Sequence, residues 1–363
     1  MNKKFLIEYL NTDSPCSNEV EAQKSWIKQV TNDCDQLITD NYGNVSALIR
    51  KENGNPNDTY KVVIDAHCDE IGWIVSRITD DGFIYVKRNG GTDNDITPGT
   101  RVKIMTEKFD ENGKQIKIKG FFGWIPIHLK KKPKADTPSE DNIFIDVTAR
   151  SLEDIESMGI EIGNYIVVDR EAEIINDKFV VSKSLDDKIG GFILSEVLKK
   201  LKIDNVKLPY DLYVVNSVQE EVGLRGAKMI TETIKPDVAI CFDVCFDTNT
   251  PMIDKNKYGD FKMGDGVVFR QGSDTHINLV RLMKKVAKEN EVPFKMSVGG
   301  GGGTNTFSYY LSNGGVVAST ISIPLRYMHT PNEMVMLEDV QKTIDYYVEL
   351  LKNINYKHNF KLV

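Results

Sequence analysis

Five short apolar runs in this sequence each lead into residues that can bind a metal ion or move a proton. The runs have the length and composition of buried β-strands, and the carboxyl ends of parallel strands in an open α/β sheet meet at one edge. The residues concerned are His67 and Asp69, Asp186, Glu220 and Glu221, Asp243, and His329. Each of them alone has an ordinary explanation as a helix cap, a loop carboxylate or a surface side chain. Five such coincidences at one sheet edge predict instead that these side chains share one polar site.

The types of these residues fit a pair of divalent metal ions. Two imidazoles and three carboxylates would give each ion one histidine and one carboxylate, with the third carboxylate shared. Glu220 is then left over, and a free carboxylate beside metal-bound water is a natural general base. Asp69 follows His67 by two residues, so it could hold the imidazole ring of a metal ligand. Zinc and cobalt both suit such ligands, and the order of affinities does not choose between them.

The Glu220–Glu221 pair also predicts a bend in the backbone. It follows the apolar run from Leu212 to Val218, which has the pattern of a buried strand. Neighbouring side chains of a regular strand point to opposite faces, so a Glu–Glu pair inside one would force a charge into the core. We therefore expect the chain to bend at this point, so that both carboxylates reach the same site.

The order of the expected elements predicts an α/β fold interrupted by a β-rich insertion. Residues 1–72 and 169–363 alternate strand-like and helix-like segments, as in the strand 62–64 and the closing helix 337–354. Residues 73–168 instead consist mostly of short strands and hairpin turns. We predict two discontinuous halves of one α/β catalytic domain, with a small β domain between them whose apolar faces could serve self-association.

The composition excludes several classes of protein. The 363 residues are 40% hydrophobic and 27% charged, which is typical of a soluble globular chain. A net charge of -7 gives no general reason to expect nucleic acid or an anionic membrane as partner, and no apolar run approaches membrane-spanning length. The five cysteines suggest no disulfide framework, and the opening residues lack the apolar core of a signal peptide. We expect a cytoplasmic protein.

Five motifs together resemble one family, the dinuclear metallo-aminopeptidases of family M42, which are related to glutamyl aminopeptidase and to the tetrahedral aminopeptidases. The motifs are DAHCDEIG at 65–72, SLDDKIGG at 184–191, VQEEVGLRGA at 218–227, the strand end at Asp243, and ISIPLRYMHTP at 321–331. The resemblance covers nearly the whole chain. It implies a mixed-sheet zinc-peptidase catalytic domain with an inserted small β-rich, PDZ- or barrel-like domain.

The resemblance also implies a role for each matching residue. His67 and Asp243 would hold one metal, Glu221 and His329 the other, and Asp186 would bridge them. Glu220 would act as general base on a metal-bridging water, and Asp69 would orient His67. Short peptides would lose their N-terminal residue, and the inserted domain would form dimers that can build a tetrahedral dodecamer.

One residue departs from the family pattern, and two alternative functions stay open. The glycine-rich stretch reads Gly301-Gly302-Gly303-Thr304-Asn305-Thr306, where the family usually has Gly-Gly-Thr-Asp. Asn305 thus replaces an acidic residue, and this change bears on how the substrate amine is recognised or how the metal ions are tuned. We expect the stretch to form a turn lining the substrate cleft. A catalytically impaired peptide-binding homologue and an endoglucanase-type glycosidase, which would use paired carboxylates without metal, are the alternatives. The preferred N-terminal residue does not follow from spacing, and His128 receives no role.

Overall fold

The larger part of the molecule is built on one mixed sheet of eight strands. The structure, a computed structural model, describes residues 1–52, 60–130, 137–299, 303–355, 358 and 360–363. The strands follow one another across the sheet in the order β1 (Gln36–Thr39), β2 (Val45–Ile49), β12 (Asp211–Ser217), β3 (Lys61–His67), β13 (Val238–Phe246), β16 (Val317–Leu325), β14 (Val267–Gln271) and β15 (Phe294–Val298). The central four strands, β12, β3, β13 and β16, are parallel to one another, so their carboxyl ends lie side by side.

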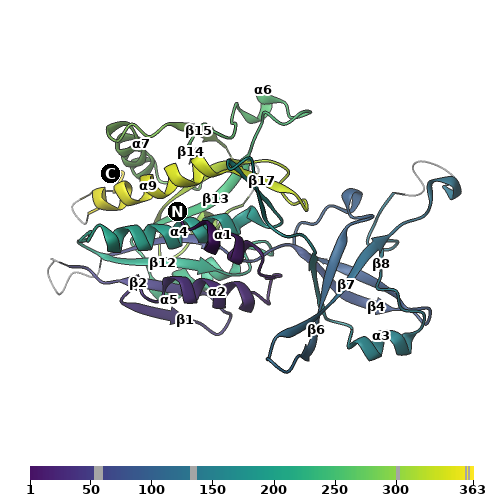
Figure 1. The fold of residues 1–363 in the computed structure, drawn as a ribbon. Coiled ribbons are helices and arrows are strands. Elements are labelled where there is room, and N and C mark those ends of the chain that lie inside the picture. The colour runs from purple at the N-terminus through teal and green to yellow at the C-terminus, as the bar shows by residue number, and fades with distance from the viewer. Residues whose placement is uncertain (53–59, 131–136, 300–302, 356–357, 359) are drawn as a thin grey trace.

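Helices cover both faces of this sheet (Figure 1). Alternate residues of β3 show the two layers, since Ile64 packs into one apolar cluster and Val63 into another. The first cluster contains side chains of α1 (Lys3–Leu10), α2 (Val20–Val30), α4 (Leu185–Ile203), α7 (Ile277–Glu289) and α9 (Leu337–Asn353). The second contains side chains of α5 (Arg225–Ile234) and α8 (Asn305–Tyr310). Both faces of the central strands are therefore buried, which explains their nearly continuous apolar sequences.

The inserted segment forms a closed barrel that stands beside the sheet (Figure 1). Its strands follow the order β4 (Gly72–Ile78), β5 (Phe83–Asn89), β8 (Phe144–Asp146), β7 (Gln115–Gly123), β6 (Arg101–Phe109) and β9 (Tyr165–Val168), and it also carries α3 (Leu152–Met158), η1 (Asn94–Ile96) and η2 (Ile127–Leu129). It has an apolar core of its own around Trp73 and Phe122, whose ring centroids lie 4.8 Å apart. Closing a sheet into a barrel removes the open strand edges at which sheets aggregate.

A third, three-stranded sheet joins β10 (Glu173–Ile175), β11 (Phe179–Ser182) and β17 (Glu333–Met336), and a short helix, α6 (Lys255–Tyr258), lies in a connection. The predicted α/β fold with an inserted small β domain is confirmed. No helix in the described ranges is both long and apolar enough to cross a membrane.

Two details of the sequence prediction are wrong. The run 179–182 that precedes Asp186 is not part of the main sheet: β11 pairs antiparallel with β10 and β17. The strand before Asp243 does not end there either, because β13 stays paired with β16 as far as Phe246. Periodicity identifies a strand and its buried face, but the choice of pairing partner and the length of pairing depend on contacts distant in sequence.

Candidate metal centre

The expected convergence of residues occurs at the carboxyl ends of the four central strands. His67 is the last residue of β3, Glu220 and Glu221 follow β12, and Asp243 lies in β13. His329 follows β16, in a left-handed backbone conformation with φ 60°. Asp186 comes from outside the main sheet, at the first turn of α4. All of the sequence-predicted site residues except His329 and Glu221 are more than nine-tenths buried.

The bend expected at the Glu220–Glu221 pair is present. Gln219, the residue before the pair, has φ 55°, a left-handed conformation that residues other than glycine rarely adopt. The strand β12 has ended by then, and the turn directs both carboxylates toward the ends of β3 and β16. Strained backbone of this kind is concentrated at functional sites, where the surrounding structure holds it in place.

Asp186 lies between the two imidazoles of the site. Its Oδ1 is 3.3 Å from His67 Nε2, and its Oδ2 is 3.4 Å from His329 Nε2. Glu221 contacts the second imidazole, with Oε1 3.1 Å from His329 Nε2. Each oxygen of Asp186 therefore faces a different histidine, which is the arrangement that a bridging carboxylate requires.

Glu220 and Asp243 lie on the His67 side of Asp186. Glu220 Oε2 is 3.9 Å from His67 Nε2. One ligand atom from each of His67, Glu220 and Asp243 can be chosen so that all three lie within 4.8 Å of one another, and the same holds for His67, Asp186 and Glu221. Two overlapping groups of potential ligands thus share His67, and Glu220 is near enough to belong to one of them.

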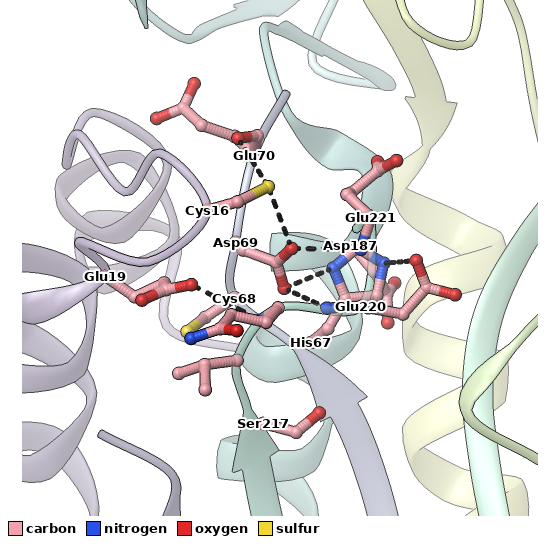
Figure 2. Close-up of polar contacts among 12 residues, drawn as sticks. Cys16, Glu19, His67, Cys68, Asp69, Glu70, Asp187, Ser217, Glu220 and Glu221 are labelled. Atoms are coloured by element: carbon pink, nitrogen blue, oxygen red, sulfur yellow. Dashed lines mark hydrogen bonds and ion pairs between the residues drawn. The ribbon is translucent and has the colours of Figure 1, made fainter. Parts of the chain in front are cut away.

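Asp69 connects the two acidic residues to the histidine (Figure 2). Its Oδ1 lies 3.4 Å from His67 Nδ1 and accepts a hydrogen bond of 3.0 Å from the backbone N–H of Glu220. Its Oδ2 accepts from the backbone N–H of Glu221 at 3.1 Å and from the thiol of Cys16 at 3.3 Å. One fully buried carboxylate therefore fixes the ring of His67 and the turn that carries both glutamates.

The electrostatics of the site favour a bound cation. Burial, with Asp186 nearby, raises the pKa of Asp243 to about 8, and burial raises the pKa of Glu220 and of Glu221. Burial opposes a charge on His329, yet hydrogen bonds to Asp186 and Glu221 raise the pKa of its imidazole to about 11. Several carboxylates are thus crowded together in a buried position. Imidazole nitrogen and carboxylate oxygen are ligands that zinc and cobalt accept, so this set of side chains fits divalent metal ions.

Three buried residues beside the site were not predicted from sequence. Glu333 of β17 accepts hydrogen bonds from the backbone N–H of Asp186 at 3.0 Å and of His329 at 2.7 Å. Glu19 accepts one from the backbone N–H of Gln219 at 3.3 Å, and Cys16 contacts Asp69 as described. None of the three follows a strand that enters the site, so strand-end reasoning had no means of finding them. The two N-terminal residues precede α2, far from the site in sequence.

Asn305 is not among the potential ligands and instead contacts the end of β12. It is the first residue of α8, it is buried, and its Nδ2 donates a 2.8 Å hydrogen bond to Ser217 Oγ at the end of β12. Residues 300–302 of the glycine-rich stretch lie outside the described residues, so its expected place in the cleft stays a prediction. His128 lies exposed in η2.

Comparisons with known proteins assign the chain to one family. The family described as M42 glutamyl aminopeptidase matches residues 43–346. This chain belongs to the M42 family. The resemblance inferred from the five motifs is thereby confirmed, and the M42 chain is a peptide hydrolase.

Several M42 relatives and solved structures are similar over nearly their whole length. Lysyl aminopeptidase of Pyrococcus furiosus is 31% identical over 88% of both chains, and glutamyl aminopeptidase of Lactococcus lactis is 28% identical over 81% of both. A TET aminopeptidase from Thaumarchaeota archaeon SCGC AB-539-E09 superimposes with a TM-score of 0.90 at 26% identity, covering 98% of this chain and 97% of its own. The TET1 peptidase of Pyrococcus horikoshii, which can assemble into a tetrahedron or a large octahedral shell, gives 0.82 at 25% identity over 97% and 99%.

Proposed function

We propose that this M42 chain is an aminopeptidase that works with two divalent metal ions, zinc or cobalt. His67 and Asp243 would hold one ion, Glu221 and His329 the other, and Asp186 would bridge them. The observation that carries the proposal is the position of Asp186, whose two oxygens lie 3.3 and 3.4 Å from the two imidazoles. When bound, such ions polarise a peptide carbonyl and lower the pKa of water, which makes hydrolysis feasible at neutral pH.

Glu220 is the residue we propose as general base. Its carboxylate would take a proton from the attacking water and return it to the leaving amine. Burial raises its pKa, so its carboxylate is a stronger base than one on the surface. Asp69 would act indirectly, because it holds both His67 and the backbone of Glu220. Because Glu220 lies 3.9 Å from His67, the experiment must distinguish a general base from a metal ligand at this position.

The test compares two isosteric variants, Glu220→Gln and Glu221→Gln. We expect Glu220→Gln to lose turnover of chromogenic aminoacyl amides while keeping two equivalents of metal, since the amide cannot accept a proton. Glu221→Gln should lose one equivalent of metal. Elemental analysis measures the metal content of each variant, and the hydrolysis assay measures its activity. Loss of metal from Glu220→Gln would contradict the assignment of Glu220 as base and Glu221 as ligand.

The alternatives predict different results in the same assays. A glycosidase with two acting carboxylates leaves the two imidazoles without a role. It would be favoured by hydrolysis of a cellulose-type substrate that survives complete chelation. A peptide-binding homologue would be favoured if the metal-loaded protein hydrolysed none of a broad panel of aminoacyl substrates.

We also propose that residues 73–168 form a self-association domain, and that 1–72 with 169–363 form the catalytic domain. The barrel exposes large apolar side chains at Phe121, Ile127 and Leu129, which a partner subunit could cover. Dimers, and a tetrahedral dodecamer built from them, are the proposed assemblies. Light scattering should give the mass of an oligomer for the wild type and a smaller mass for Ile127→Asp. The free state of all five cysteines supports a cytoplasmic location.

A further inference from the structure

A cavity lies beside the proposed metal centre, between the barrel and the catalytic sheet. The space free of atoms there is about 510 Å³, a value that includes space open to solvent. Its lining includes three of the proposed ligands, Asp186, Glu221 and His329. The opposite side is supplied by the barrel, including Trp73 and Ile96. A group bound there would touch both the reacting centre and the inserted domain.

The barrel loop between β5 and β6 reaches the metal centre directly. The carbonyl oxygen of Gly91 lies 3.0 Å from His329 Nδ1, so this loop fixes the ring that would hold the second ion. A Cβ on Gly91 would lie 2.9 Å from the same nitrogen, which explains why the loop can approach so closely only with glycine. This contact therefore fixes the position of the barrel side of the cavity relative to the proposed metal centre.

Three buried polar groups in the cavity lining lack a hydrogen-bond partner among the described residues. They are Trp73 Nε1, Thr92 Oγ1 and Ser184 Oγ, from side chains that are 4%, 4% and 9% exposed. The indole N–H can only donate, and the two hydroxyls can donate or accept. Buried polar groups are almost always hydrogen-bonded, so three together in one cavity indicate a bound polar group. That group must offer an acceptor to Trp73.

The charges around the cavity disfavour an anionic occupant, because five carboxyl groups belong to its described lining, those of Glu70, Asp93, Asp186, Glu221 and Glu333. Among the described residues of the lining, Lys183 is the one lysine or arginine, and it is already paired with Asp13 at 2.6 Å and with Glu70 at 2.8 Å. A ligand carboxylate would therefore find no free lysine or arginine in this described lining, and it would lie near the carboxyl of Glu333. A ligand ammonium would meet the metal ions of the proposed function. The apolar lining of Ile96 and Val168 suits a stem of methylene groups.

We propose that this cavity receives the side chain of the first residue of the substrate peptide, and that it selects an uncharged side chain with an aliphatic stem and a terminal amide, as in glutamine. The proposal rests on the proposed aminopeptidase function for the identity of the ligand. The inserted barrel thus determines specificity, through Trp73 and Thr92, in addition to its role in self-association.

The test uses four free amino acids as non-hydrolysable product ligands of the metal-loaded protein, with calorimetry as the readout. Glutamine, glutamate, norleucine and lysine have similar lengths and share the α-amino and α-carboxylate groups, so differences between them report the side chain. We expect glutamine to bind about tenfold more tightly than norleucine and glutamate, the effect of one well-made hydrogen bond or of one avoided buried charge. Lysine should bind as weakly as glutamate.

Two variants and a matched control assign the preference to the cavity. Trp73→Phe keeps a ring against Phe122 but removes the indole N–H, and Thr92→Val removes the hydroxyl at constant shape. Each should bring the preference for glutamine over norleucine below about threefold. Trp124→Phe makes the same change at a half-buried barrel tryptophan outside the cavity, and should preserve the preference. Equal binding of glutamine and any of the other three amino acids by the wild type would overturn the proposal. Persistence of the glutamine preference in both cavity variants would overturn it as well.

Hydrolysis of the four matched p-nitroanilides separates this proposal from the proposed function. If none is hydrolysed while Trp73-dependent glutamine binding remains, the aminopeptidase function fails and the cavity assignment stands. If all four are hydrolysed with equal kcat/KM in wild type and Trp73→Phe, the function stands and the cavity assignment fails.

Discussion

Replacing Asp69 by Asn changes a side chain that contacts both His67 and the turn bearing the two glutamates. The carboxylate has two acceptor oxygens, and each serves a backbone N–H, that of Glu220 at 3.0 Å or that of Glu221 at 3.1 Å. The amide of Asn has one oxygen and one NH2 group. In either orientation, one backbone N–H must therefore face a nitrogen that cannot accept its hydrogen bond.

The expected magnitude follows from this loss in a fully buried position. A buried N–H left without an acceptor costs about 1–3 kcal/mol, so we expect the free energy of unfolding of the metal-free protein to fall by about 2 kcal/mol. The imidazole of His67 also loses its charged neighbour at 3.4 Å. Removing such a partner of a metal ligand typically weakens metal binding by about 10–100-fold.

Competition with a chromophoric chelator measures zinc affinity, and urea unfolding of the metal-free protein measures stability. Asp81→Asn, the same change at an exposed turn residue of the barrel, is the control and should leave both quantities unchanged. If Asp69→Asn bound zinc within about twofold of the wild type, the orienting role assigned to Asp69 would be wrong, since such partners normally contribute at least about tenfold.

Three further perturbations test contacts around the site. Gly91→Ala should push the ring of His329 and weaken binding of the second metal equivalent by about tenfold or more, as measured by stoichiometric zinc titration. Burial and Asp69 raise the pKa of Glu19 to about 8 from an ordinary value of 4.5, so the unfolded chain binds fewer protons between these values and stability falls as pH rises through that window. Glu19→Gln should remove this part of the pH dependence, which urea unfolding at pH 5 and pH 8.5 measures. If the two urea midpoints of the variant differed as much as those of the wild type, the prediction would be wrong. Asp13→Asn leaves buried Lys183 with one carboxylate instead of two, and should lower the free energy of unfolding by about 3–5 kcal/mol in urea titrations at pH 7.

The amino-acid sequence by itself determined which residues meet and roughly why. Apolar runs such as 62–64 identify the central strands, and parallel strands bring their carboxyl ends to one edge whatever the details of packing. The Glu220–Glu221 pair required a bend because two neighbouring charges cannot share one buried strand, and Gln219 provides that bend. The five motifs also indicated the M42 family, since a match of residue types and spacing along the chain does not depend on how the chain packs.

Tertiary structure alone decided how these residues are held. Asp186 reaches the site from a helix that follows a separate small sheet, and Glu333 supports it from a strand of that same sheet. Cys16 acts on the site through Asp69, and the barrel loop acts through Gly91. These contacts join segments distant in the chain, and they depend on how the sheets, the helices and the barrel pack against one another. Local periodicity records which face of an element is buried but not which distant backbone atom will lie within hydrogen-bonding distance of it.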